Sequence, residues 1–267
     1  MTPQISPRTL IEAFLPLTGT APLAHIYDTA NLAGLDDQPV RLTIRRMIAS
    51  GDVEQAGRGR TGTLALTIAG RRRLERDRQS LALAFAQDAG DAPWDRRWRL
   101  VAVSVPERER AARDMLRRAL YELGAVAIST GLYVSPHDLV TELPDDVRPR
   151  LSTATTDDLD VRGITHPREV AEALWPSQPT ITAYSMLDAA LHRDASDTGV
   201  PAIVRQLLLA DALELAIRAD PLLPLELREG SWAPSTTRTT WAGRWHALSE
   251  QVQSPIYQGW NVPSART

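Results

Sequence analysis

The chain of 267 residues contains no cysteine and no lysine, and only 2 phenylalanines. A chain without cysteine forms no disulfide bonds and no thiolate metal sites, which fits a reducing cytosol. The opening residues, MTPQISPRTL, lack the apolar core of a signal peptide, and no apolar run reaches transmembrane length. These absences predict a cytoplasmic protein that does not enter a membrane.

The absence of lysine means that all 30 residues of the Lys and Arg class are arginine. We attribute this bias mainly to coding, so a single arginine carries little information by itself. Their distribution carries more: residues 41–78 contain 10 arginines and 4 acidic residues, although the whole chain has a net charge of −3. A basic island on an acidic chain is typical of a small module that contacts nucleic acid.

Residues 36–51 within DDQPVRLTIRRMIASG predict a helix that begins after Asp36 and ends before Gly51. Asp36 is a suitable N-cap, Pro39 is tolerated in the first turn, and Gly51 favours the left-handed conformation that follows many helices. An apolar set recurs at helical spacing and is expected to point inward. Its members are Val40, Ile44, Met47 and Ile48.

Two short extended runs follow this helix and flank residues 57–62, a turn of glycine and arginine. This pattern predicts a β-hairpin with a cationic tip. Two shorter helices are predicted earlier, at about residues 7–15 and 23–32, so the complete order is that of a winged helix–turn–helix. A plain helix and hairpin with solvated charges is the simpler alternative, but a turn needs glycine and does not need arginine at its tip.

Eight residues are candidates for DNA contact, because a recognition helix enters the major groove while the wing contacts phosphates or the minor groove. We assign base edges to Gln38, Leu42 and Arg45, since Gln bonds adenine, Leu meets a thymine methyl and Arg bonds guanine. Phosphates or groove walls are assigned to Arg41, Arg46, Arg58, Arg60 and Thr61. For each residue the alternative is a solvated side chain. The arginine-rich helix predicted after the hairpin is interpreted mainly as a solvated face, with residues 71–73 as candidates for a position near the DNA backbone.

The chain is long enough for two or three domains, and residues 87–93 have the composition of a linker. The segment after it predicts the order strand, helix, strand, strand, helix, strand, which is ferredoxin-like. The second helix of that order is expected from Pro136 to about Leu143. We therefore predict an α+β fold with three domains. They are a winged helix–turn–helix DNA-binding domain at 1–88, a ferredoxin-like central domain at 94–165 for dimerisation or effector sensing, and a helical C-terminal domain at 166–267.

Three stretches carry recognisable motifs. Pro93–Leu139 opens with W-D-x-x-W-R-L, continues through a strand ending in Pro-Glu and an arginine-rich helix, and closes with S-P-x-D-L. Asp220–Trp232 reads DPLLPLELREGSW, and Gln38–Met47 reads QPVRLTIRRM. In this combination and order they resemble the PaaX-like regulators, the phenylacetic acid catabolon repressor family.

This resemblance implies a homodimeric bacterial transcription regulator, usually a repressor of a catabolic operon, that binds an inverted repeat in double-stranded DNA. It also implies a small effector, an aryl-acyl-CoA thioester such as phenylacetyl-CoA, that releases the DNA. No cofactor and no enzymatic activity are expected. Pro39 and Leu42 replace commoner residues of the family's recognition helix, so the operator should differ. The segment 155–166 departs from the family pattern, so no effector-binding residues are assigned.

Two enzymatic functions are the alternatives to a regulator. The central segment also resembles small CRISPR-associated ferredoxin-like nucleases, in which an acidic residue near the end of the first strand holds a divalent cation. Ser104 stands at that position, and a hydroxyl is a weaker ligand for a hard cation than a carboxylate. None of the five histidines has a partner at a recognised metal-ligand spacing, and an acyl-CoA enzyme is disfavoured because no nucleophile and base pair is visible. Trp94 and Trp98 are interpreted as anchors of the linker, with effector binding as the alternative.

Overall fold

The structure is a computed structural model that describes residues 5–143, 145–196, 199–252 and 256–258. It confirms the predicted α+β class, with a helical N-terminal region, a central sheet and a helical C-terminal region. Among the described residues no helix is long and apolar enough to cross a membrane.

Contacts within the chain define two compact units, with the division falling inside two of the helices. Unit 1 comprises 1–85, 181–218 and 233–267, and unit 2 comprises 86–180 and 219–232. The two units are groups of residues in mutual contact, and they do not test the three predicted domain ranges. Those ranges therefore remain a prediction.

Unit 1 begins with the predicted winged helix–turn–helix order. Three helices precede a hairpin, and a short strand before the second helix completes a three-stranded antiparallel sheet in the order β1-β3-β2. The elements are α1 (Pro7–Phe14), β1 (Ala21–Pro22), α2 (Leu23–Leu32), α3 (Asp37–Ala49), β2 (Val53–Ala56), β3 (Thr63–Leu66) and α4 (Ile68–Asp88).

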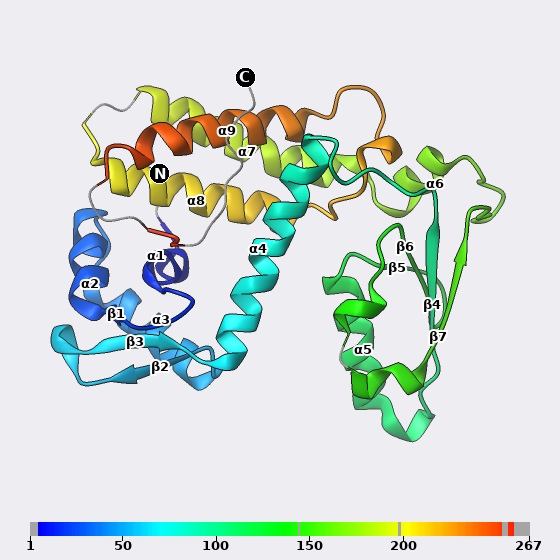
Figure 1. Cartoon of the computed structure of the whole chain (residues 1–267), viewed down its shortest axis with the longest axis horizontal. Coiled ribbons are helices and arrows are strands. Elements are labelled where there is room, and N and C mark those ends of the chain that lie inside the picture. The colour runs from blue at the N-terminus through cyan, green and yellow to red at the C-terminus, as the bar shows by residue number, and fades with distance from the viewer. Residues whose placement is uncertain (1–4, 144, 197–198, 253–255, 259–267) are drawn as a thin grey trace. The chain divides into compact units, whose positions relative to one another are not determined.

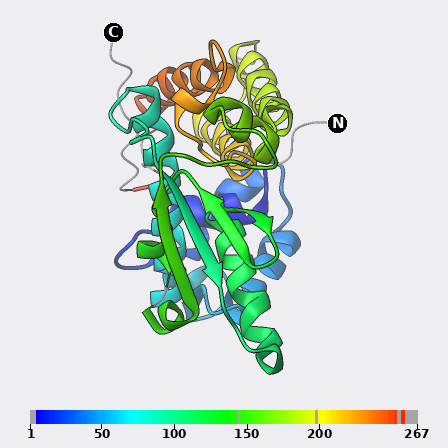
Figure 2. The same cartoon turned by 90° about the vertical axis from the view of Figure 1, so that its right-hand side faces the viewer.

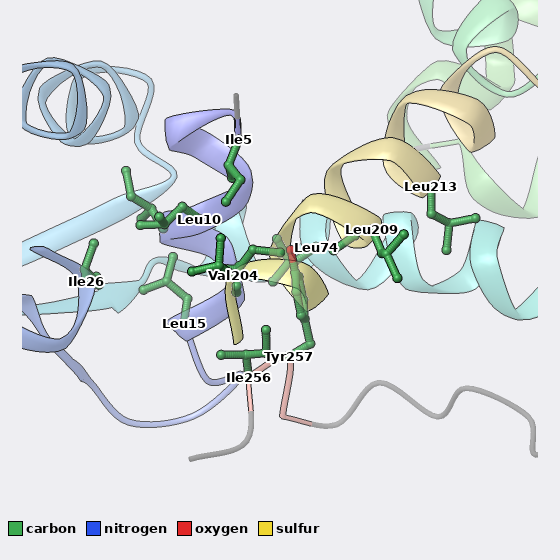
Figure 3. Packing of buried hydrophobic residues seen from close by; sticks show 14 of the residues in the cluster. Ile5, Leu10, Leu15, Ile26, Leu74, Val204, Leu209, Leu213, Ile256 and Tyr257 are labelled. Carbon is green, nitrogen blue, oxygen red and sulfur yellow. The ribbon is translucent and has the colours of Figure 1, made fainter. Parts of the chain in front are cut away.

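The C-terminal helices of unit 1 share its hydrophobic core with these N-terminal elements (Figure 3). They are α7 (Ser177–Ser196), α8 (Ala202–Arg218) and α9 (Ala233–Ser249). Polar contacts join α1 to α8 as well, since the Thr9 hydroxyl donates to a carboxylate oxygen of Asp211 at 2.5 Å. The backbone N–H of Tyr257 donates to the carbonyl of Ala13 at 2.7 Å, so residues far apart in the sequence form one core.

Unit 2 contains a four-stranded antiparallel sheet in the order β5-β6-β4-β7 (Figure 2). Numbered from the first strand of the unit, this order is 2-3-1-4, as in a ferredoxin-like fold. The elements are β4 (Trp98–Val103), α5 (Arg110–Glu122), β5 (Val126–Ser129), β6 (Leu132–Ser135), β7 (Leu151–Thr156) and α6 (Pro167–Leu174).

The predicted helix from Pro136 to about Leu143 is wrong. The structure has the short 3-10 segment η3 (Val140–Glu142) within this range, and a second one, η4 (Asp145–Arg150), follows it. The side chain of Asp138 accepts a hydrogen bond from the N–H of Val140 at 3.2 Å, and such local bonds compete with helix formation.

Apolar clusters cover both faces of the sheet at its inner strands. On one face, Leu116 and Leu120 of α5 pack with Val101 and Tyr133. On the other face, residues of α6 and of the segment around η5 (Leu225–Leu227) pack with Trp98 and Val134. The strands that carry these residues are therefore buried on both sides.

Candidate nucleic-acid interface

Helix α3 has one buried and one exposed face, as its spacing predicts. Val40, Ile44 and Met47 are buried in the core of unit 1. The prediction that Ile48 points inward is wrong, because this residue is 40% exposed. At about 100° per residue it lies on the edge of the apolar stripe, well away from Met47. The exposed face carries five of the predicted contact residues: Gln38, Arg41, Leu42, Arg45 and Arg46.

The ends of α3 follow the predicted positions, with one difference. Asp36 is the N-cap residue, but its side chain makes no capping hydrogen bond. At the other end, Gly51 adopts a φ of 75°, which permits the tight turn into β2. The N–H of Asp52 then donates to the carbonyl of Met47 at 2.9 Å, which fixes the start of the wing against the end of the helix.

The wing consists of β2, β3 and the tip between them, in which Gly59–Thr61 form the short helix η1. Gly62 is required there, because a Cβ atom at this position would lie 2.9 Å from the carbonyl oxygen of Ala56. The Thr61 hydroxyl donates to the carbonyl of Arg58 at 3.0 Å, so it supports the tip from within. Arg58 itself is exposed.

Arg60 connects the wing to both preceding helices. Its guanidinium forms an ion pair with Asp28 of α2 and lies 3.7 Å from a carboxylate oxygen of Asp37 in α3. It also lies over the ring of Tyr27, 5.6 Å from the centroid. Arg60 therefore holds the wing tip beside the start of α3, a role that sequence reasoning did not assign to it.

The other cationic candidates have no such contacts. No acidic side chain in the described part of the chain pairs with these four exposed arginines: Arg41, Arg45, Arg46 and Arg58. Unpaired guanidinium groups on one helix face and one hairpin tip are free to meet phosphates or base edges.

An ion-pair network lies behind the recognition helix. Arg8 of α1 donates to Glu12 at 2.7 Å and to Asp52 at 2.7 Å. Arg73 of α4 pairs with Glu12, and its Nε lies 3.8 Å from Asp52. The prediction that the arginines of α4 form mainly a solvated face does not hold for Arg73, which joins α4 to α1 and to the turn after α3.

The pKa values of the two carboxylates in this network, Glu12 and Asp52, are shifted in opposite directions. Burial raises the pKa of Glu12 above its ordinary value, although Arg73 and Arg8 act against it. Burial also acts to raise the pKa of Asp52, but hydrogen bonds from Arg8 and Ser50 and the charge of Arg73 hold it below its ordinary value. The turn between recognition helix and wing thus carries a carboxylate that its neighbours keep ionised.

In unit 2, Trp98 and Trp175 belong to the hydrophobic core, and Trp94 packs against it. Trp98 is 1% exposed and stacks on Trp175 with ring centroids 6.2 Å apart. Trp94 packs edge-on against Trp98 at 5.3 Å. These contacts favour the interpretation of both residues as anchors over a role in effector binding.

Ser104 follows β4 and is exposed, and its N–H donates to the carbonyl of Arg150 at 2.9 Å. The position therefore presents a hydroxyl and no carboxylate. Within the described ranges, no group of three or more His, Asp or Glu side chains is arranged to hold a metal ion.

The fold and these surfaces define a chain with a winged helix–turn–helix and a separate ferredoxin-like sheet. Residues 91–158 match the family model described as the PaaX protein central Cas2-like domain, so the predicted PaaX-like resemblance is confirmed. A search of the curated proteins finds no match.

Among solved structures, the chain is similar to the uncharacterized protein Rv0674 from Mycobacterium tuberculosis, with a TM-score of 0.54 and 20% sequence identity. The alignment covers 85% of this chain and 88% of that one. At this identity the likeness shows the fold alone, and it extends well beyond the central domain.

Proposed function

We propose that this protein is a homodimeric transcription regulator that binds an inverted-repeat operator in double-stranded DNA and represses a catabolic operon. The observation that carries the proposal is the exposed face of α3, where Arg41, Arg45 and Arg46 have no acidic partner among the described residues. A surface of unpaired guanidinium groups beside a cationic hairpin tip suits the charge and the groove dimensions of duplex DNA.

The proposed contacts divide into two classes. Gln38, Leu42 and Arg45 of α3 would meet base edges in the major groove. Phosphates or groove walls would be contacted by Arg41, Arg46 and Arg58, which fix register without selecting sequence. Arg60 and Thr61 have contacts within unit 1, so we assign them to holding the wing in position, with Arg60 close enough to the surface to reach a phosphate.

Regulation would come from a small effector. The match to a PaaX central domain supports an aryl-acyl-CoA thioester or a related compound as the candidate. Such a molecule would release the operator only to the extent that it prefers a state in which the two recognition helices are wrongly spaced. The proposal places this protein in the cytoplasm, where operator DNA and acyl-CoA esters are both present.

The decisive experiment is selection of bound duplexes from a random pool by the purified full-length chain, repeated with candidate acyl-CoA esters. The expected result is an inverted repeat whose half-sites are about one or two helical turns apart. Binding to it should weaken steeply with salt, because arginine contacts release counterions from the phosphates. Recovery of no enriched motif, with binding equal for all sequences, would refute a sequence-specific regulator.

A metal-dependent nuclease is the function to exclude, since the central domain is described as Cas2-like. Ser104 in place of an acidic ligand argues against it. Incubation of the purified chain with labelled DNA and RNA and with Mg²⁺ or Mn²⁺ tests this directly. The proposal that this protein has no catalytic role would be overturned by metal-dependent cleavage of either nucleic acid. That cleavage must also disappear when residues of unit 2 are substituted.

A further inference from the structure

The two edges of the sheet in unit 2 differ in how they are protected. At one edge, β5 has only four residues, and its pairing with β6 is interrupted by a register shift between Ala127 and Ser129. Short and irregular edge strands of this kind resist pairing with another chain. At the other edge, β7 pairs with β4 over six residues, from Leu151 opposite Val103 to Thr156 opposite Trp98, with no shift.

Strand β7 carries none of the usual features that block an edge. Its sequence, LSTATT, contains no charge, no proline and no glycine. The four central residues, 152–155, are all exposed, although they alternate between the two faces of the sheet. Leu151, at the start of β7, packs against one of the apolar clusters of the sheet, but residues 152–155 lie outside them. Within the sheet of unit 2, β7 is an edge strand that pairs with β4 (Figure 1).

The hydrogen-bonding groups of β7 that face outward can be assigned. The N–H of Ser104 donates to the carbonyl of Arg150, so Arg150 directs its backbone groups toward β4. In an antiparallel ladder the N–H and C=O of one residue point to the same side, and the side alternates along the strand. The outward-facing groups of β7 are therefore those of Leu151, Thr153 and Thr155.

We propose that β7 is the interface of the homodimer, and that two copies pair along it as antiparallel strands with Ala154 opposite Ala154 of the second copy. This interface rests on the proposed function, in which the protein acts as a dimer. A two-fold axis perpendicular to the sheet requires a residue to face its own copy. Centring it on Ala154 places Thr153 opposite Thr155 in hydrogen-bonded pairs and joins the two sheets into one.

The charged residues that flank β7 favour a second copy of this chain as the partner, paired in the antiparallel orientation. Arg150 precedes β7, and Asp157 and Asp158 follow it. Arg150 ends η4 and Asp157 begins a bend, so these charges flank the paired strands and do not extend the ladder. Centring on Ala154 brings the Arg150 end of each β7 next to the end of the other copy that carries Asp157 and Asp158. Opposite charges across paired strands stabilise the pairing, whereas a parallel arrangement would place like charges together. Within the same chain Arg150 also donates to Glu109 at 2.9 Å, which orients it without excluding a second carboxylate.

Because the natural chain has no cysteine, a single introduced cysteine can react only with its counterpart in a second copy. Opposite residues in a non-hydrogen-bonded pair have Cα atoms about 4.5 Å apart, which is within the range for a disulfide. The full-length Ala154→Cys variant should form a covalent dimer under mild oxidation. The matched control is Ser152→Cys, which is equally exposed on the same strand. In the proposed register its two copies lie about 13 Å apart, so it should stay monomeric on a non-reducing gel.

A second test uses charge. Replacing both Asp157 and Asp158 with Arg opposes Arg150 with like charges, and the dissociation constant of the dimer should rise by about tenfold or more in low salt. Adding Arg150→Asp to that variant restores opposite charges and should recover much of the lost affinity. Light scattering or sedimentation over a concentration series measures each constant.

The outcomes separate the interface from the function. Covalent dimers of Ala154→Cys without those of Ser152→Cys, together with recovery in the charge-swapped variant, support the pairing along β7. A dimer whose dissociation constant is unchanged by the aspartate replacements, equal cross-linking of both cysteine variants, or a monomeric wild-type chain would overturn it. Neither test requires DNA, so selection from the random pool still decides separately whether the chain binds an operator.

Discussion

The guanidinium of Arg60, at the tip of the wing, forms an ion pair with the carboxylate of Asp28 in α2. These two residues are 32 positions apart in the sequence. The pair, together with the ring of Tyr27, gives the hairpin tip a defined place next to α3 before any DNA is bound. Preorganisation of this kind lowers the entropic cost of binding.

Arg60→Ala should therefore loosen the wing without unfolding unit 1. Exposed ion pairs contribute at most about 1 kcal/mol to stability, so the thermal midpoint should change little. Amide hydrogen exchange in residues 57–62 should accelerate severalfold, because the tip loses its contacts with α2. Arg58→Ala is the matched control, since Arg58 has no acidic partner among the described residues. Equal exchange rates in both variants would show that the ion pair does not order the tip.

Arg45 and Arg58 should differ in what they contribute to binding DNA. A bidentate contact between Arg45 and a guanine provides about 1–3 kcal/mol of base discrimination, so Arg45→Ala should relax selection at one position of each half-site. Arg58→Ala should weaken binding to all sequences alike and should lower the salt dependence by about one counterion per protomer. Titration of a panel of operator variants at several salt concentrations separates these effects. Equal losses on every sequence for both variants would contradict the division.

Local spacing predicted the elements of the winged helix–turn–helix well. The burial of Val40, Ile44 and Met47 and the turn at Gly51 follow from helical periodicity and from the conformational freedom of glycine. The exposed arginines of α3 follow from the same pattern, because residues opposite a buried stripe face solvent. Ile48 was predicted wrongly because it lies at the margin of that stripe, where packing of neighbouring elements decides burial.

Contacts between distant segments were not predictable from the sequence. Arg73 and Glu12 are 61 positions apart, and nothing in either local pattern indicates that they pair. The packing of α8 and α9 with the N-terminal helices in one core is of the same kind. The unprotected edge at β7 could be found only from the sheet order, since an uncharged strand of Thr and Ala has no distinctive periodicity.

Asp194 of α7 should make the stability of unit 1 depend on pH. It is buried and accepts hydrogen bonds from Arg205, at 2.7 Å and 3.2 Å, and from Arg244. Burial alone would raise its pKa, but these two arginines hold the pKa of Asp194 below its ordinary value of 3.8. Because the pKa is depressed in the folded state, the stabilisation is present above pH 3.8 and is lost as the pH falls through the folded-state value.

Asp194→Asn should accordingly lower the free energy of unfolding at neutral pH by about 2 kcal/mol or more, because two guanidinium groups lose their carboxylate. The difference from the wild type should shrink as the pH falls below 3.8. Denaturant unfolding at a series of pH values measures it. Asp188→Asn is the control on the same helix, since Asp188 is exposed and should show little effect. A difference that stays constant down to the lowest pH would contradict the assignment.

Of the glycines that lie within helices, Gly70 should tolerate substitution least. It lies in the first turn of α4, where a Cβ atom would meet the carbonyl oxygen of Asp52 at 1.9 Å, far closer than atoms can approach. Its N–H donates to the Thr67 hydroxyl at 3.0 Å, and Thr67 in turn donates to the carbonyl of Gly51. An added methyl group must therefore push α4 away from the turn that joins α3 to the wing.

Gly70→Ala should lower the free energy of unfolding by at least about 2 kcal/mol, because backbone on both sides of the contact cannot move aside at little cost. It should also weaken operator binding in the fraction that remains folded, since the turn after α3 positions the wing. Gly243→Ala in α9 is the control, as its Cβ would meet nothing within 4 Å. There the usual helix preference for alanine should stabilise the chain by about 0.5–1 kcal/mol. Denaturant unfolding of both variants decides the matter, and a stable Gly70→Ala protein would show that α4 does not pack closely against Asp52.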